Sequence, residues 1–172
     1  VGGGRGQVVC TWCALGTGMA RVRPDGSYLF TLTHSQSLGV SFAWSPDGQN
    51  LAYFTVLGEG DQRYGVTCVV YGISLRERCF EVGGGGFIWS PDGNELAISN
   101  RQETFILNVN TGVTRTLAQE DLRLQDWSPD GTKLLFSRRN RIMTINTDGT
   151  GETLLAQPGY LPKWSPDGTR VA

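Results

Sequence analysis

The sequence predicts an all-β fold built from four-stranded antiparallel repeats, and three observations support this. The string Trp-Ser-Pro-Asp-Gly occurs four times in 172 residues, beginning at Trp44, Trp89, Trp127 and Trp164. Successive copies are 45, 38 and 37 residues apart, a spacing at which one repeat is one small sheet. Each copy is followed by a short run rich in apolar and aromatic residues, which is typical of a β-strand.

The repeated string has the composition of a turn between two strands. Proline fixes its φ at about −65° and favours extended backbone before it, while aspartate and glycine suit the tight turn that follows. The predicted strands that end at the first three tryptophans are 40–43, 87–88 and 122–126. The predicted strands after the turns are 50–56, 95–99, 133–137 and the short segment 170–172.

A second hairpin follows in each repeat, which brings the number of strands per repeat to four. Strand 104–109 turns at Asn-Thr-Gly and returns as 113–117, and strand 141–145 turns at Thr-Asp-Gly and returns as 153–155. In the repeat that begins before Trp44, strand 66–71 turns through 74–77 and returns as 78–82. Four-stranded repeats of this length, arranged radially, make a β-propeller.

The two ends of the chain resemble complementary parts of one further repeat. Residues 1–33 have the pattern of the last three strands of a repeat, since 19–26 matches 142–149. Residues 160–172 supply the first strand of a repeat. We therefore expect a single propeller domain over 1–172, with full blades at about 38–82, 84–117 and 122–156. It would be a closed ring of about four blades or part of a larger propeller. Our hypothesis for closure is that strand 161–165 pairs with 7–13.

These features together resemble a known family. The Trp-Ser-Pro-Asp-Gly string, a following x-x-[LV]-Ala-x-x-Ser pattern and a later Asp-Gly or Thr-Gly hairpin are similar to the TolB-like β-propeller repeat, a relative of WD repeats. The resemblance covers roughly residues 7–172. It implies a module that docks partner proteins in an extracytoplasmic setting, the bacterial periplasm or cell surface. The same repeat occurs in the propellers of prolyl oligopeptidases.

The residues of the repeated string are expected to build each repeat and not to bind an ion. Aspartate can accept hydrogen bonds from the amides of its own turn, and tryptophan can pack between sheets. The expected structural residues are Trp44, Asp47, Gly48, Trp89, Asp92, Gly93, Trp127, Asp130, Gly131, Trp164, Asp167 and Gly168.

Cys10 and Cys13 have the Cys-x-x-Cys spacing of metal and redox sites, but their predicted context does not favour either role. Cys10 and Cys13 would point to opposite faces of a strand, and a zinc site would need two further ligands. Cys68 and Cys79 lie on neighbouring predicted strands, offset by three or four positions if the turn centres near Leu75. They either form a disulfide or pack as small buried apolar residues. We expect no metal ion and no other cofactor.

The sequence lacks the constellations that enzymes use. His34 is the only histidine, no Gly-x-Ser-x-Gly string occurs, and the glycine runs are not followed by the Lys-Ser/Thr of a phosphate loop. A net charge of −1 gives no field that would attract nucleic acid, and no stretch approaches the length of an apolar membrane-spanning helix. We therefore expect a protein that is not an enzyme, does not bind nucleic acid and does not insert into membranes.

Function is expected in the loops that differ between repeats. In a propeller, the two hairpin turns of each blade lie at one end, which we call the regular rim. The loops between second and third strands, and between blades, lie at the other end, the irregular rim. Loops on a rigid scaffold commonly carry binding sites. The candidate partner contacts are Asp61, Arg63, Tyr64, Arg101, Glu103, Arg138, Arg139 and Arg141. The arginines could also meet phosphate or a carboxylated sugar.

Three interpretations of function stay open. The first is a non-catalytic interaction or scaffold module that binds protein partners through the irregular rim. The second is the propeller gate of a prolyl-oligopeptidase-like peptidase whose hydrolase domain lies outside this sequence. The third is a structural subunit that self-assembles into rings or fibres.

Overall fold

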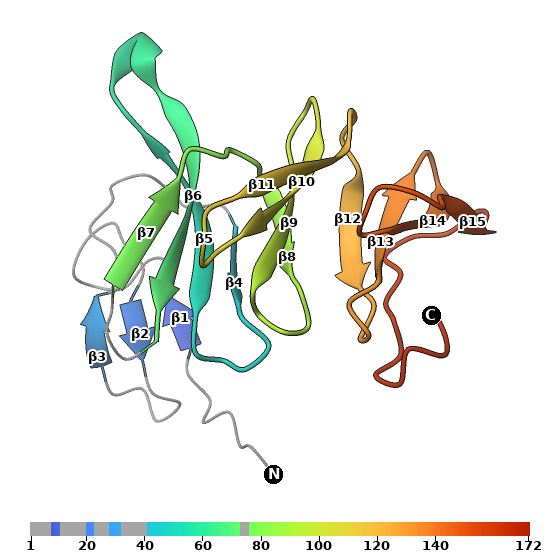
Figure 1. Ribbon diagram of the computed structural model, residues 1–172. Coiled ribbons are helices and arrows are strands. Elements are labelled where there is room, and N and C mark those ends of the chain that lie inside the picture. Colours follow the sequence, from blue (N-terminus) through green and yellow to red (C-terminus); the bar gives the residue numbers. More distant parts are fainter. Residues whose placement is uncertain (1–7, 11–19, 23–27, 32–40, 73–75) are drawn as a thin grey trace. The chain divides into compact units, whose positions relative to one another are not determined.

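The computed structural model describes residues 8–10, 20–22, 28–31, 41–72 and 76–172 (Figure 1). The chain divides into two compact units, Val1–Gly83 and Gly84–Ala172. The described residues form strands and one short 3-10 helix, which confirms the predicted all-β fold class.

The Val1–Gly83 unit contains a three-stranded and a four-stranded antiparallel sheet. The first sheet consists of β1 (Val8–Cys10), β2 (Ala20–Val22) and β3 (Tyr28–Thr31). The second consists of β4 (Phe42–Trp44), β5 (Leu51–Leu57), β6 (Tyr64–Tyr71) and β7 (Arg76–Phe80), with the 3-10 helix η1 (Gly60–Gln62) between β5 and β6. Strands within each sheet pair in chain order, as propeller blades require.

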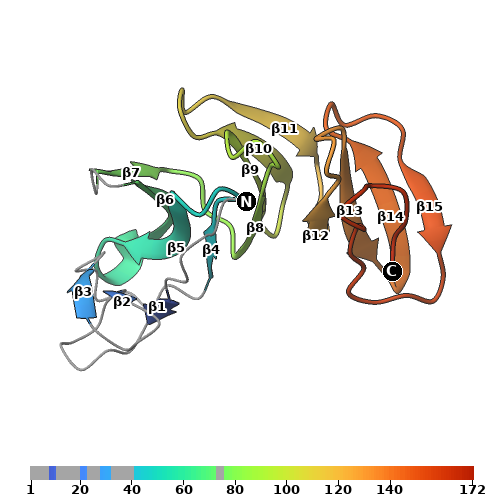
Figure 2. The same ribbon diagram turned by 90° about the horizontal axis from the view of Figure 1, so that it is seen from below.

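The Gly84–Ala172 unit contains two four-stranded antiparallel sheets (Figure 2). One consists of β8 (Gly86–Trp89), β9 (Glu95–Ser99), β10 (Thr104–Asn108) and β11 (Thr114–Ala118). The other consists of β12 (Arg123–Trp127), β13 (Lys133–Arg138), β14 (Arg141–Asn146) and β15 (Thr153–Ala156). Beyond β15, Trp164 and Val171 form an isolated antiparallel bridge, the start of another hairpin.

The predicted ring closure stays a prediction. Of the segment 7–13, the structure describes Val8–Cys10, which pairs with β2. Gln7 and residues 11–13, including Cys13, lie outside the described residues, as do His34 and residues 73–75 of the β6–β7 turn.

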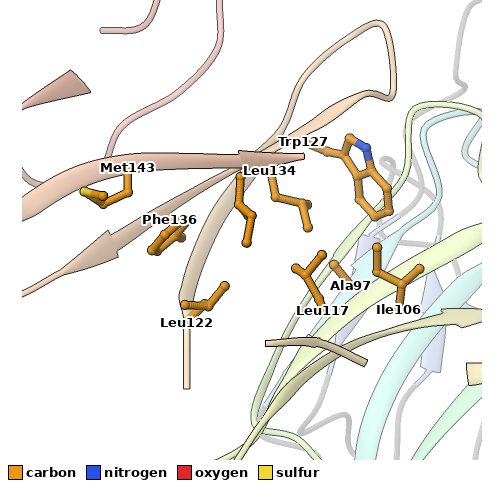
Figure 3. Close-up of a cluster of buried hydrophobic side chains, with 9 residues drawn as sticks. Ala97, Ile106, Leu117, Leu122, Trp127, Leu134, Phe136 and Met143 are labelled. Atoms are coloured by element: carbon orange, nitrogen blue, oxygen red, sulfur yellow. The ribbon is translucent and has the colours of Figure 1, made fainter. Parts of the chain in front are cut away.

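The core of the Gly84–Ala172 unit lies between its two sheets. Side chains alternate across a strand, so Leu134 and Phe136 share one face of β13. Figure 3 shows these residues, with Trp127 of β12, facing Ile106 and Leu117 of the neighbouring sheet. Leu134, Phe136 and Ile106 are fully buried. In the Val1–Gly83 unit, a smaller cluster consists of Leu51, Tyr53, Val66, Cys68 and Val70, with Trp44 and Leu57 packed against it.

The four Ser-Pro-Asp-Gly turns share one hydrogen-bond pattern. At the second copy, the Ser90 hydroxyl donates to the Asp92 carboxylate at 2.6 Å and accepts from the Glu95 amide at 2.9 Å. The Gly93 amide donates to the Ser90 carbonyl, and the φ of Gly93 is 70°. Serine and aspartate are bonded in the same way at Asp47, Asp130 and Asp167. The repeated carboxylates are thus engaged in building their own turns.

These hydrogen bonds lower the pKa of the turn carboxylates. The pKa of Asp92 lies below its ordinary value, because Ser90 and then Asn94 donate hydrogen bonds that favour the ionised form. The pKa values of Asp47 and Asp130 are lowered in the same way, and the bonds from Ser165 and Thr169 lower that of Asp167 to about 2. The turns are therefore fully bonded at neutral pH.

Hydrogen bonds also join the two hairpin turns of each blade. The Val109 amide donates to the Asn94 carbonyl at 3.0 Å, and the Thr147 amide donates to the Thr132 carbonyl at 3.0 Å. In the β4–β7 sheet, the Gly72 amide donates to the Asn50 side chain. Both turns of a blade therefore lie at the same end, which is the regular rim.

The β6–β7 hairpin differs from the prediction. The strands pair from Tyr71 opposite Arg76, so the turn is shorter than predicted and the ladder has no offset at the cysteines. Cys68 lies directly opposite Cys79, with their Cα atoms 4.0 Å apart, and the two form a disulfide. The predicted offset of three or four positions was wrong because the return strand β7 begins at Arg76, two residues earlier than predicted.

Candidate functional site

Three of the predicted partner contacts lie in the Val1–Gly83 unit. Asp61 lies on η1 and Arg63 follows it, and both are exposed. Tyr64, predicted in a loop, is instead the first residue of β6 and pairs with Leu57. Tyr64 is 48% exposed, so its ring stays accessible although its backbone pairs within the ladder.

The other five lie in the Gly84–Ala172 unit. Arg101 and Glu103 belong to the β9–β10 loop, which is held by the Asn100 side chain accepting from the Gln102 and Glu103 amides at 2.8 Å. Arg101 is exposed and Glu103 is partly buried. This loop presents a short polar edge on the irregular rim.

The segment from Arg138 to Arg141, which holds three of the predicted contacts, forms a two-residue turn closed by one residue pair. Arg138 and Arg141 pair as the last rung of the β13–β14 ladder. Only Arg139 and Asn140 form the turn, with φ values of 50° and 62°. Two successive left-handed residues are the mark of a type I′ hairpin turn, whose twist matches that of the flanking strands.

A pocket of about 470 Å³ opens beside this turn, and we call it the arginine pocket. Its volume falls in the range of ligand sites. The pocket is lined by Asp121, Arg123, Ser137, Arg138, Arg139, Asn140, Gly159 and Tyr160. These residues come from the loop before β12 and the start of that strand, from the end of β13 and the turn that follows it, and from the loop after β15. The arginine pocket thus belongs to the irregular rim of the β12–β15 blade.

The loop after β15 is fixed against the β13–β14 turn. The Gly159 amide donates to the Asn140 carbonyl at 3.1 Å. A Cβ atom at Gly159 would lie 2.5 Å from Cγ1 of the buried Ile142, so only glycine permits this approach. The wall that carries Tyr160 is therefore held in place by backbone contacts.

The loop before β12 is fixed by buried hydroxyl groups. The Ser99 hydroxyl donates to the Asp121 carboxylate at 2.6 Å and lies 3.0 Å from the Thr104 hydroxyl. The Thr104 hydroxyl donates to the Glu120 carbonyl and accepts from the Leu122 amide at 3.0 Å. Thr104 and Leu122 are fully buried, so this wall of the arginine pocket is rigid as well.

The three arginines of the pocket differ in their partners. Arg138 forms ion pairs with Glu120, at 2.7 Å, and with Glu152. Its guanidinium also lies 5.6 Å from the centre of the Phe136 ring. Arg123 and Arg139 are exposed, and neither has an ion-pair partner within the described part of the chain. Arg138 is thus paired within the protein, whereas Arg123 and Arg139 are exposed to solvent.

Sequence reasoning missed Arg123, Asp121 and Tyr160. Arg123 begins β12 and was assigned to the interior of a first strand, and the other two were given only as parts of loops between blades. Arg141, which was a candidate, does not line the arginine pocket, and its side chain donates to Gln157 at 3.2 Å. No local sequence pattern could reveal these residues, because the pocket brings together loops that lie almost 40 residues apart in the chain.

The structure also bears on metal binding. Among the described residues, one group has suitable ligand atoms close together, namely Cys68, Glu77 and Cys79. The two sulfur atoms are bonded to each other in the disulfide, so they are not the thiolates that bind metals. Over the same described residues, no helix is long and apolar enough to cross a membrane.

Comparisons with known proteins identify the fold. No family model and no curated protein matches the sequence. Among solved structures, TolB from Acinetobacter baumannii matches with a TM-score of 0.58 and 17% identity, over 89% of this chain and 41% of that one. A protein assigned as TolB from Agrobacterium tumefaciens matches with a TM-score of 0.62 and 21% identity, over 94% and 66%. The tricorn protease matches with a TM-score of 0.68 and 12% identity, over 97% and 17%.

These similarities support a protein of the β-propeller class with TolB-like blades. At such identities the likeness concerns the fold alone. The chain spans about 41% and 66% of the two TolB structures.

Proposed function

We propose that this chain is a non-catalytic β-propeller module that binds a protein partner through its irregular rim. In the Gly84–Ala172 unit, the arginine pocket is the principal contact. The observation that carries the proposal is the pair Arg123 and Arg139, whose exposed guanidinium groups line a rigid pocket beside the exposed ring of Tyr160. Arginine and tyrosine are enriched where protein interfaces gain most of their binding energy.

The regular rim offers a poorer contact surface. Its turn carboxylates at Asp92 and Asp130 accept hydrogen bonds from their own turns. A second pocket of about 290 Å³ lies beside these two turns, and Glu95, which also lines it, is paired with Arg115. Groups already satisfied within the fold gain little from a partner.

The setting that we propose is extracytoplasmic, either the bacterial periplasm or the cell surface. Two observations support it. The blades resemble those of TolB structures. The Cys68–Cys79 disulfide fits the same setting, because disulfides persist in oxidising compartments.

Site-specific photo-crosslinking in cells tests the proposal. A photoreactive phenylalanine analogue replaces Tyr160 on the irregular rim or, in the matched control, Val113, which is 66% exposed beside the β10–β11 turn. We expect one defined adduct with another polypeptide from position 160 and none from position 113. Adducts from position 113 alone would contradict the choice of rim.

A second candidate function is the gate of a peptidase. The similarity to the tricorn protease favours it, since this chain aligns with 17% of that larger protein. In that case a hydrolase domain would be encoded beside this segment, and position 160 would crosslink within the same polypeptide. The molecular mass of the adduct therefore separates the two candidates.

A further inference from the structure

We propose that the arginine pocket binds a carboxylate side chain of an acidic peptide segment, with a neighbouring apolar side chain of that segment resting on Tyr160. This inference depends on the proposed function and specifies the chemistry of the partner. It is carried by three observations: two uncommitted guanidinium groups, a strained arginine and an exposed apolar edge.

The first observation concerns charge. Arg138 pairs with both Glu120 and Glu152, whereas Arg123 and Arg139 have no ion-pair partner within the described ranges. A guanidinium group is planar and presents paired donors that match the two oxygens of a carboxylate. The guanidinium groups of Arg123 and Arg139 can therefore bind an anion that the protein itself does not supply.

The second observation is the backbone of Arg139. This residue occupies the first position of a type I′ turn with a φ of 50°, where asparagine, aspartate and glycine are strongly preferred. A side chain with a Cβ is strained in this conformation, and such strain concentrates at functional sites. Arg139 makes no ion pair with the described residues that would offset this strain. Binding of a ligand then explains why an arginine occupies this strained position.

The surrounding charges favour a single carboxylate over phosphate. Asp121 lines the pocket, and Glu120 and Glu152 are bound to Arg138 at its edge. A phosphate dianion would meet these three carboxylates with twice the charge of a carboxylate. The two uncommitted guanidinium groups are sufficient for one carboxylate, whose single charge suffers less repulsion.

The third observation identifies the ligand as a peptide. Tyr160 lines the pocket and Leu161 follows it in the chain, with exposures of 69% and 80%. They present apolar surface beside the guanidinium groups, and the Gly159 contact with Asn140 holds that wall in place. An acidic residue followed by an apolar residue would contact both the guanidinium groups and the apolar surface. A free anion would contact only the guanidinium groups.

Titration of the whole 172-residue chain, labelled with ¹⁵N and followed by NMR, tests the inference. The probes are the blocked peptide Gly-Ser-Gly-Glu-Leu-Gly-Ser-Gly, the same peptide with Gln in place of Glu, and inorganic phosphate. We expect the Glu peptide to shift the amides of Arg123, Arg139 and Gly159 saturably. We expect at least tenfold weaker binding of the Gln peptide and of phosphate.

Two variants and a control localise the binding. Arg123→Ala and Arg139→Asn should each weaken the Glu peptide about threefold to tenfold, and asparagine suits the left-handed backbone at position 139. Arg170→Ala, which removes an exposed arginine of the same unit away from the pocket, should leave the affinity unchanged. The dispersion of each variant's amide spectrum reports that it is folded.

Several outcomes would overturn the inference. These are equal binding of the Glu and Gln peptides, tighter binding of phosphate than of the Glu peptide, or shifts that avoid the pocket. If the Glu peptide does not bind but position 160 still crosslinks to a partner, the acidic-peptide inference fails and the proposed function stands. If both fail, the irregular rim is not the contact surface.

Discussion

The backbone amide of Gly159 donates a 3.1 Å hydrogen bond to the carbonyl of Asn140, which joins the loop after β15 to the turn between β13 and β14. Neither segment could form the arginine pocket alone. The turn supplies the guanidinium group of Arg139, and the loop supplies Tyr160. The hydrogen bond holds the two segments together, so this side of the pocket depends on a close approach of two backbones.

Substitution of Gly159 tests this dependence. Gly159→Ala places a Cβ 2.5 Å from Cγ1 of Ile142, and overpacking a buried side chain costs about 1–3 kcal/mol. We expect that loss in the free energy of unfolding, measured in urea. Gly85→Ala is the matched control, because a Cβ there meets nothing within 4 Å, and we expect a change within about 0.5 kcal/mol. Equal effects of the two substitutions would contradict the packing argument.

Arg139→Asn separates stability from binding. Asparagine tolerates a φ of 50° better than arginine, so the variant should be more stable by up to about 1 kcal/mol. Thermal and urea unfolding measure the gain. The same variant should bind the Glu peptide more weakly. A destabilised variant would mean that Arg139 serves the fold, and the strain argument would then be wrong.

The Ser-Pro-Asp-Gly turns give a third prediction. Ser90 is 4% exposed, and its hydroxyl both donates to Asp92 and accepts from the Glu95 amide. Ser90→Ala leaves that amide without its acceptor, which should cost about 1–3 kcal/mol of unfolding free energy. Urea denaturation followed by tryptophan fluorescence measures the loss. A change below about 0.5 kcal/mol would show that the hydroxyl is dispensable.

The turn aspartates predict the response to acid. Their folded-state pKa values lie below the ordinary 3.8, with Asp167 at about 2. A lowered folded-state pKa contributes stability that is complete above the unfolded-state value and is lost as the pH falls through the folded-state value. We therefore expect the unfolding free energy to fall between about pH 4 and pH 2. Carboxyl ¹³C shifts measure the titrations directly, and midpoints at or above 3.8 would contradict the turn geometry.

The disulfide gives the last stability prediction. Cys68 and Cys79 are 11 residues apart, and a cross-link over so short a loop stabilises by about 3 kcal/mol when the unfolded chain is otherwise free. The double variant Cys68→Ala, Cys79→Ala should lose that amount in the Val1–Gly83 unit. Denaturation with and without a reducing agent measures it. The variant should respond less to the reductant than the native chain does.

Much of the fold could be predicted from the sequence because the repeat is local. The Ser-Pro-Asp-Gly turn is stabilised by its own residues, so its copies set the register of the strands on both sides. The β6–β7 hairpin carries no such turn, and its register depends on cross-strand pairing, including Cys68 with Cys79. The offset predicted from the sequence was therefore wrong, and the disulfide stayed an open alternative.

The candidate site was predicted only in part, for a physical reason. Arg138 and Arg139 stood out because they neighbour each other in the chain. Arg123 joins them only through strand pairing, since it lies opposite Ser137 in the β12–β13 ladder. Whether an arginine is already paired could not be predicted either, because Glu120 and Glu152 reach Arg138 from different loops.

The affinity of the crosslinked partner for rim variants tests the central claim most directly. The partner captured at position 160 is purified, and its Kd is measured by calorimetry for the native chain, for Arg123→Glu with Arg139→Glu, and for the regular-rim variant Val113→Lys. The account predicts at least a tenfold rise in Kd for the double variant and no change for Val113→Lys. An unchanged Kd for the double variant, with a raised Kd for Val113→Lys, would contradict it.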